Sequence, residues 1–131
     1  MKKVMVFGTY DLLHKGHLDL FKQARKYGDY IIVVVARDKN VKIIKGKFPR
    51  RKECRRAAEI APYADLVVLG SLKDRYFAIK KYKPNIICLG YDQKADIVRL
   101  KKFNIPVKRL KAYMPHKYKS SKIPAQNLFF L

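Results

Sequence analysis

The sequence contains no tryptophan, only two cysteines and only 10 acidic residues, against 31 lysines and arginines. The two cysteines, Cys54 and Cys88, have neither metal-site nor redox-motif spacing, so we expect free thiols in a cytoplasmic protein. No apolar run approaches the length of a transmembrane helix, and the apolar stretch after Lys3 is too short for a secretory signal. These absences predict a cytoplasmic protein without a membrane span.

Two further absences disfavour common functional classes. The dinucleotide-binding fingerprint GxGxxG is missing, which argues against a dehydrogenase. His14 and His17 lie close together in the sequence, but two ligands are too few for a zinc site, and His116 is the only other histidine. We therefore expect no metal site built from the protein's own side chains.

The excess of basic residues gives a formal net charge of +21 at pH 7. Such a charge favours polyanionic partners, namely nucleic acids, nucleotides or anionic membranes, but does not choose among them. Tyrosines beside lysines, as in KKYK and HKYK, are compatible with a nucleic-acid-binding module because they can stack on bases. Against that alternative, the basic residues are spread along the whole chain and no nucleic-acid-binding motif occurs. We expect no specific nucleic-acid partner.

Apolar runs alternate with segments of helical periodicity. Strands are predicted at Lys3–Phe7, Tyr30–Ala36, Leu66–Leu69, Ile86–Leu89 and Pro106–Leu110. Helices are predicted from Leu18 to a stop at Gly28 and over Lys52–Ile60, Leu72–Tyr82 and Lys94–Phe103, whereas Arg37–Arg51 is expected to be irregular. Strands apolar on both faces that alternate with helices predict an α/β fold, a Rossmann-like parallel five-stranded sheet flanked by helices, in one domain over residues 1–131.

Ligands of such sheets bind beyond the carboxyl ends of the strands. That edge is predicted to carry GTYD at 8–11, Arg37 and Asp38, Gly70 and Ser71, and GYDQ at 90–93. Gly16 is expected to open the first helix, and a helix start is a ready anion site. His14 and His17, three residues apart, would then face the same anion and stabilise charge on a phosphate. We assign Asp11 as the cap of this helix, with a site role as the alternative.

The stretch GTYDLLHKGH resembles the GTFDxxHxGH motif of the cytidylyltransferase-like nucleotidyltransferases, also called the HxGH or HIGH-type family. The resemblance extends from Val4 to about Ile123. It implies an enzyme that joins a nucleoside triphosphate to a phosphorylated acceptor and releases pyrophosphate, without a covalent enzyme intermediate. It also implies a divalent ion, Mg²⁺, that arrives with the nucleotide.

The resemblance also implies the site residues. The catalytic residues are His14, His17 and Lys45, with Lys42 as the rival of Lys45. The nucleotide is expected to contact Phe7, Gly8, Thr9, Tyr10, Gly16, Gly90, Asp92, Gln93, Ser120 and Ser121. The acceptor or its phosphate is expected near Arg37, Asp38, Arg55 and Lys119, with Glu53 close by. Arg56 is the alternative to Arg55, and Lys117 or Lys122 are the alternatives to Lys119.

Within this family, VVARD, LGS and LGYDQ most resemble the archaeal FAD synthases, which transfer AMP from ATP to FMN. The rival is the glycerol-3-phosphate cytidylyltransferases, which use CTP. Those enzymes usually have tryptophan where this chain has Gln93, and an arginine where this chain reads MPHKYKSSKI. The resemblance and the apolar LFFL end of the chain also predict a homodimer.

Overall fold

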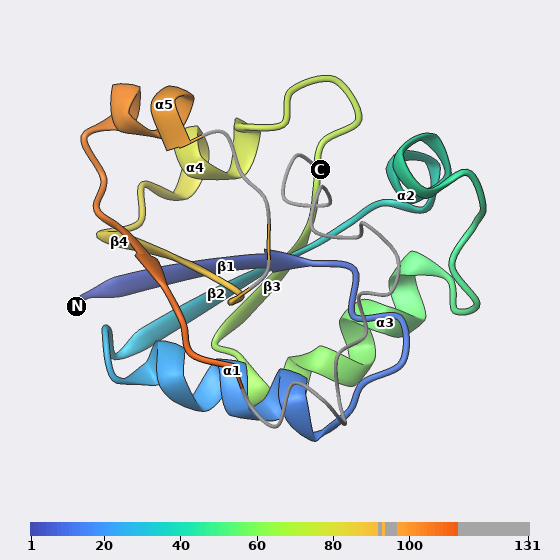
Figure 1. Ribbon diagram of the computed structural model, residues 1–131, viewed down its shortest axis with the longest axis horizontal. Helices are drawn as coiled ribbons and strands as arrows, with labels where there is room; N and C mark the ends of the chain where they lie inside the picture. The colour runs from blue at the N-terminus through green and yellow to red at the C-terminus, as the bar shows by residue number, and fades with distance from the viewer. Residues whose placement is uncertain (92, 94–96, 113–131) are drawn as a thin grey trace.

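The computed structural model describes residues 1–91, 93 and 97–112, so Asp92, Lys119, Ser120 and Ser121 lie outside the described residues. Its centre is a five-stranded sheet in the order β3-β2-β1-β4-β5, in which every neighbouring pair is parallel (Figure 1). The strands are β1 (Lys3–Gly8), β2 (Tyr30–Val35), β3 (Leu66–Leu69), β4 (Ile86–Leu89) and β5 (Val107–Arg109). The predicted Rossmann-like α/β fold is thus confirmed.

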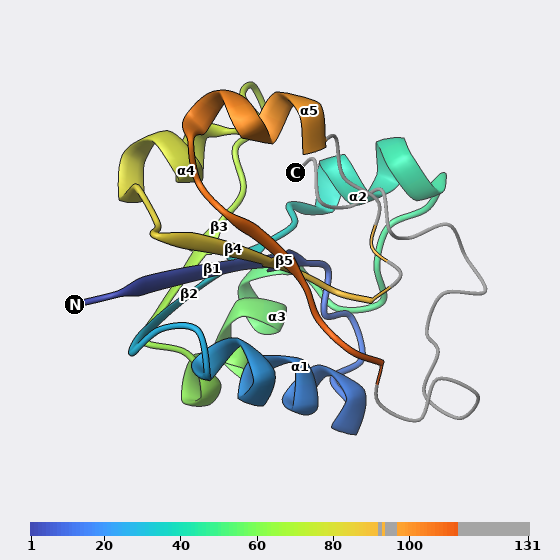
Figure 2. The same ribbon diagram turned by 60° about the vertical axis from the view of Figure 1, so that its left-hand side comes forward.

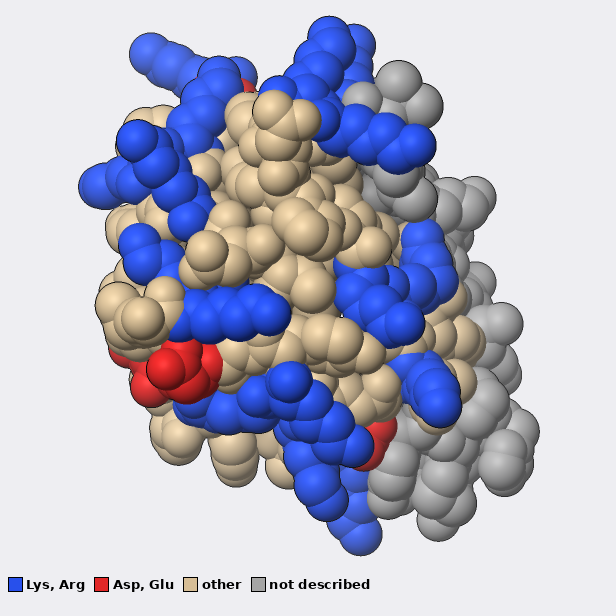
Figure 3. Space-filling model, turned by 90° about the vertical axis from the view of Figure 1, so that its left-hand side faces the viewer, with Lys and Arg blue, Asp and Glu red and all other residues tan. Residues whose placement is uncertain are grey.

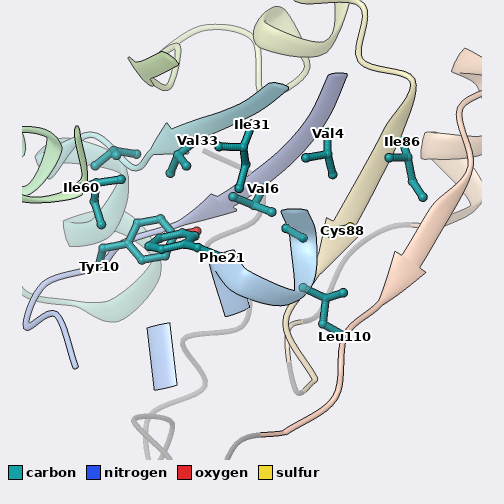
Figure 4. Close-up of a cluster of buried hydrophobic side chains, with 12 residues drawn as sticks. Val4, Val6, Tyr10, Phe21, Ile31, Val33, Ile60, Ile86, Cys88 and Leu110 are labelled. Carbon is teal, nitrogen blue, oxygen red and sulfur yellow. The ribbon is translucent and has the colours of Figure 1, made fainter. Parts of the chain in front are cut away.

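The strands bury both faces, as their uninterrupted apolar runs predict. Because successive side chains point to opposite faces, Val4 and Val6 of β1 belong to one core cluster, while Met5 and Phe7 belong to the other. Figure 4 shows the first cluster, in which Tyr10 and Phe21 lie against the strand residues. Cys88 is buried in the same cluster, which confirms its core placement, and Cys54 is exposed; both are free thiols.

Four of the described helices cover the two faces of the sheet, and a fifth lies beyond the carboxyl ends of its strands. Figures 1 and 2 show α1 (Lys15–Arg25) and α3 (Glu53–Ile60) on one face and α4 (Phe77–Tyr82) and α5 (Ile97–Leu100) on the other. Short 3₁₀ helices follow α3 at Ala61–Tyr63 and α5 at Lys101–Phe103. The remaining helix, α2 (Asp38–Lys45), lies beyond the carboxyl ends of the strands. None of the described helices is long and apolar enough to cross a membrane.

The expectation that Arg37–Arg51 is irregular was wrong, because α2 forms inside it. Asp38 stands in the first turn of α2, Lys42 and Lys45 in its last turn, and Gly46 ends it with a φ of 83°, which favours glycine. The predicted helix over Leu72–Tyr82 begins only at Phe77. Before it, the Ser71 hydroxyl and the Asp74 carboxylate accept backbone N–H groups and hold a turn.

Candidate active site

The order of the strands reverses direction at β1, between β2 and β4. The chain runs from β1 outward through β2 to β3, then crosses to β4 on the other side of β1. Ligands of doubly wound sheets bind at this reversal point, outside the carboxyl ends of the strands. Here those ends are Gly8 of β1 and the loop that begins at Gly90 after β4.

Gln93 links the end of β1 to the loop that follows β4. Its side chain is buried; the amide nitrogen donates to the Phe7 carbonyl at 3.1 Å, and the amide oxygen accepts from the Gly90 N–H at 3.0 Å. Arg109 of β5 holds the same loop, because its Nη1 donates to the carbonyls of Gly90 at 2.8 Å and Gln93 at 2.6 Å. No sequence pattern singled out Arg109, an exposed residue at the end of a three-residue strand.

The exit of β1 is shaped by Gly8, Thr9 and Tyr10. A Cβ at Gly8 would lie 2.6 Å from Cζ of Tyr10, so the close approach of the ring requires glycine. Tyr10 turns back with a φ of 54°, and its ring packs against Phe21 and the His17 ring at centroid distances of 5.3 and 5.4 Å. Thr9 is buried, and its hydroxyl has no hydrogen-bond partner among the described residues. A ligand phosphate at this edge would satisfy that hydroxyl.

The two motif histidines build the start of α1. His14 is the N-cap: its Nδ1 accepts from the Gly16 N–H at 3.0 Å, and its own N–H donates to Nδ1 of His17 at 3.2 Å. The two rings stack with centroids 3.9 Å apart. The sequence prediction that paired these side chains at a helix start agrees with this geometry.

Asp11 is not the cap of α1, contrary to the expectation. Its carboxylate instead accepts the backbone N–H groups of Arg50 and Arg51, each at 2.9 Å. The loop before α3 is thereby tied to the exit of β1. Histidine occupies the cap position because its Nδ1 reaches the same orphan N–H group that a carboxylate would take.

The hydrogen bonds fix the tautomer of both imidazoles. Since each Nδ1 accepts an N–H, the proton of each neutral ring lies on Nε2. Burial and, second, the neighbouring His14 lower the pKa of His17 to about 3, and burial lowers the pKa of His14. Both rings are therefore neutral at pH 7, and each carries one N–H donor on its far edge.

Lys45, at the end of α2, reaches the same region. Burial lowers the pKa of its half-buried amine, the nearby Asp11 carboxylate opposes that shift, and Lys47 and Arg56 reinforce it. Lys42 is engaged elsewhere, because its Nζ donates to the Gly46 carbonyl at 2.8 Å and lies 5.7 Å from the centre of the Phe48 ring. The geometry thus favours Lys45 over its rival as the lysine of the site.

The predicted acceptor residues separate into buried and exposed groups. The Arg37 guanidinium pairs with Glu53 at 3.1 Å and the Asp38 carboxylate pairs with Arg56 at 2.7 Å. Arg55 points outward, with 66% of its side chain exposed, and lies 3.6 Å from Glu59. Arg56 is completely buried beside Thr9. Arg56 lies four residues before Ile60, so both face the buried side of α3. This spacing distinguishes Arg56 from Arg55 in the sequence.

The described residues contain no group of three or more histidines, cysteines, aspartates or glutamates that could hold a metal ion. A divalent ion at this site would therefore depend on ligands brought by a nucleotide, as Mg²⁺ commonly does. The edge instead gathers N–H and ammonium donors, namely the start of α1, the Nε2–H groups of two imidazoles and Lys45. Such a donor set suits a polyphosphate.

Comparison with known proteins finds similar sequences over most of the chain. The model of the cytidylyltransferase-like family matches residues 5–125. The FAD synthase of Ferroglobus placidus is 43% identical over 96 residues, which are 73% of this chain and 63% of that protein. The FAD synthase of Aciduliprofundum boonei is 39% identical over 120 residues, which are 86% of this chain and 80% of that protein.

A solved structure agrees with the sequence relatives. The crystal structure of the lipopolysaccharide core biosynthesis protein from Thermoplasma volcanium has a TM-score of 0.80 and 38% identity, and the match covers 86% of this chain and 98% of that one. The family match, the parallel sheet and the motif at the end of β1 all agree. The chain belongs to the cytidylyltransferase-like family of nucleotidyltransferases.

Proposed function

We propose that this protein is an FAD synthase, which transfers the AMP group of ATP to FMN and releases pyrophosphate. The observation that carries the proposal is its similarity to proteins named FAD synthase, at 43% and 39% identity. The chain spans 63% of the length of the first of these relatives and 80% of the second. The N–H and ammonium donors gathered at the site described above support the proposal.

The reaction joins two anions, so its main requirement is the positioning and neutralisation of charge. A phosphate oxygen of FMN attacks the α-phosphorus of ATP, and the bond from that phosphorus to the bridging oxygen breaks. The electron pair of that bond leaves with pyrophosphate. The attacking phosphate is already ionised, so no side chain has to remove a proton from it.

The start of α1 binds the triphosphate in this proposal. Backbone N–H groups and the positive end of the helix dipole face the phosphates. The Nε2–H groups of His14 and His17 donate to oxygens whose charge grows as the α-phosphorus becomes five-coordinate. The Thr9 hydroxyl and the Lys45 ammonium add one donor each. Because the imidazole orientations are fixed by the cap hydrogen bonds, these donors need little rearrangement during the reaction.

Mg²⁺ accompanies the ATP in this proposal and would neutralise part of the phosphate charge. We assign the nucleoside to the loop at 90–93, beside the carboxyl ends of β1 and β4. Gln93 links these ends through both atoms of its amide, at a position where the rival glycerol-3-phosphate cytidylyltransferases usually have tryptophan.

We further propose that the protein is a cytoplasmic homodimer and that its basic surface is a solvated one that attracts anionic substrates. In Figure 3, which views the side where the chain begins, lysines and arginines surround a centre of other residues and few acidic residues are seen. Basic side chains thus also lie away from the candidate site, which supports general attraction over a nucleic-acid stripe. Light scattering at micromolar concentration measures the assembly.

One assay tests the proposed function. The purified protein is incubated with Mg²⁺ and either ATP or CTP, against FMN or glycerol 3-phosphate, and pyrophosphate release is measured for each of the four pairs. We expect release with ATP and FMN, together with FAD as the product. Release only with CTP and glycerol 3-phosphate would assign the protein to the rival group.

A further inference from the structure

Arg56 is a fully buried charged side chain in a protein whose other described arginines all keep contact with solvent. All three of its nitrogens donate to protein oxygens. Nε donates to the Arg51 carbonyl at 2.9 Å, Nη1 to the Thr9 carbonyl at 2.8 Å, and Nη2 to the Asp38 carboxylate at 2.7 Å. A buried guanidinium is tolerated only when it is paired and hydrogen-bonded in this way.

The three acceptors of Arg56 belong to three separate segments. Thr9 is the exit of β1, Asp38 is the first residue of α2, and Arg51 lies in the loop before α3. The starts of α2 and α3 are also tied to each other, because the Asp38 N–H donates to the Glu53 carboxylate at 2.8 Å and the Glu53 N–H donates to the Asp38 carboxylate at 3.3 Å. One guanidinium therefore fixes where α2 stands relative to β1.

The position of α2 matters because it carries Lys45. Asp38 and Lys45 are seven residues apart, two turns of helix, so they lie on the same side of α2. Val41 lies between them and is buried, which shows that this side faces the protein. The charges of Asp11 and Arg56 both act on the Lys45 amine, which places the amine near the segment that Arg56 holds.

We propose that Arg56 is a positioning residue for the transfer reaction: its guanidinium clamps the exit of β1 to the start of α2 and so holds Lys45 over the phosphate-binding edge. Arg56 does not touch the substrate, since it is buried and its three nitrogens are already engaged. The inference rests on the proposed function for the identity of the phosphates, and it assigns the role of Arg56 from the geometry alone.

A double-mutant cycle between Arg56 and Lys45 tests this inference. The variants are Arg56→Lys, Lys45→Ala and both together, and the steady-state constants are measured with the substrate pair that the wild-type protein turns over. Lysine keeps the positive charge but cannot reproduce the three-way fork of the guanidinium. We expect Arg56→Lys to lower kcat roughly ten- to hundredfold, as a misplaced catalytic group does, and to raise KM for the triphosphate but not for the acceptor.

We expect the effects of Arg56→Lys and Lys45→Ala on kcat to be non-additive. If Arg56 acts by placing Lys45, the double variant is no slower than Lys45→Ala alone, because the lysine to be placed is already missing. Multiplicative effects of the two substitutions, or wild-type constants for Arg56→Lys, would overturn the inference. A purely structural role would reduce the amount of folded protein, and thus kcat, with both KM values unchanged.

Two controls complete the experiment. Arg25→Lys alters an arginine–aspartate pair of the same 2.7 Å length that lies outside the site, between α1 and Asp65, and we expect its constants to match the wild type. Asp38→Asn weakens the same Arg56–Asp38 contact from its other partner, so this variant replaces Arg56→Lys if that protein does not fold. Its effect on kcat should be non-additive with that of Lys45→Ala in the same way. If the wild-type protein turns over no substrate pair, the proposed function fails, and the cycle is measured instead from ATP affinity by calorimetry.

Discussion

Replacing His17 by asparagine separates the two tasks that the structure gives to this residue. Nδ1 of His17 accepts the His14 N–H and caps α1, while Nε2 carries the proton on the far edge of the ring. The side-chain oxygen of asparagine is as many bonds from the backbone as Nδ1, so His17→Asn keeps the cap and loses the donor. Glutamine at this third position of the helix accepts the same N–H through its side-chain oxygen, as in a capping box, and its side-chain nitrogen corresponds to Nε2, so His17→Gln keeps both the cap and a donor.

The expected magnitudes follow from these two contacts. Loss of one preorganised donor to a transition-state oxygen lowers kcat by about 10²–10³, which is about 3–4 kcal/mol. Loss of a helix cap lowers the free energy of unfolding by about 1 kcal/mol. His17→Asn should therefore lose activity at nearly unchanged stability, His17→Gln should keep its stability and retain more activity, and His17→Ala should lose both.

The measurements are kcat and KM from pyrophosphate release and the free energy of unfolding from urea denaturation. We expect KM for ATP to change much less than kcat in His17→Asn, because the charge that Nε2–H stabilises develops only in the transition state. A stable His17→Asn variant with near wild-type kcat would refute the assignment of His17 as a catalytic donor. Equal losses of kcat in the asparagine and glutamine variants would contradict the role of the Nε2 donor, because only the glutamine variant keeps a donor at that place.

Three further predictions concern other residues of the site. Lys45→Ala should raise KM for ATP and lower kcat, whereas Lys42→Ala should do neither, because the Lys42 amine is held by Gly46; the opposite result in steady-state kinetics would exchange their roles. The free energy of unfolding should fall as pH is lowered from 7 towards 5, because the unfolded chain protonates His17 near pH 6.5 and the folded chain only near pH 3. His17 contributes at most about 1.4 kcal/mol per pH unit to this fall, and His14, whose pKa is also lowered by burial, adds to it. Urea titrations should show that the free energy of unfolding of His17→Asn depends less on pH than that of the wild type. An equally steep pH dependence would show that groups other than His17 cause the fall. Tyr10→Phe should leave the free energy of unfolding unchanged or raise it by about 1 kcal/mol, because the buried hydroxyl has no hydrogen-bond partner among the described residues. A clear loss of stability in the same denaturation assay would show that the hydroxyl does have a partner.

The sheet could be predicted from the sequence because its strands carry their own signal. The runs VMVF and IIVVV are apolar at every position, which is typical of a strand covered on both faces. Helix α2 gave no comparable signal, since Val41 is the one residue of it that is buried. Its stability comes from Asp38 and Glu53 at neighbouring helix starts and from Gly46 at its end, contacts between segments that no periodicity reveals.

The motif at the end of β1 predicted that His14 and His17 act together, but not how they are held. A carboxylate is the expected cap of a helix, so Asp11 was the natural choice. The structure gives that task to the histidines themselves, which use Nδ1 for the cap, so that the proton of each neutral ring lies on Nε2. Asp11 holds the neighbouring loop instead. Spacing alone does not show this division, because it depends on which nitrogen of each ring meets a backbone N–H.

The choice between neutral and charged donors follows from the same arrangement. Two stacked imidazolium rings 3.9 Å apart would repel each other strongly, and burial adds to that cost, so the rings remain neutral. In our proposal the positive charge comes instead from Lys45 of α2, while the Arg56 guanidinium binds Asp38 at the start of that helix. Two neutral imidazole rings can therefore stack in direct contact, and in the proposed reaction both donate to one phosphate. Two charged rings at the same distance would repel each other in the absence of the phosphate.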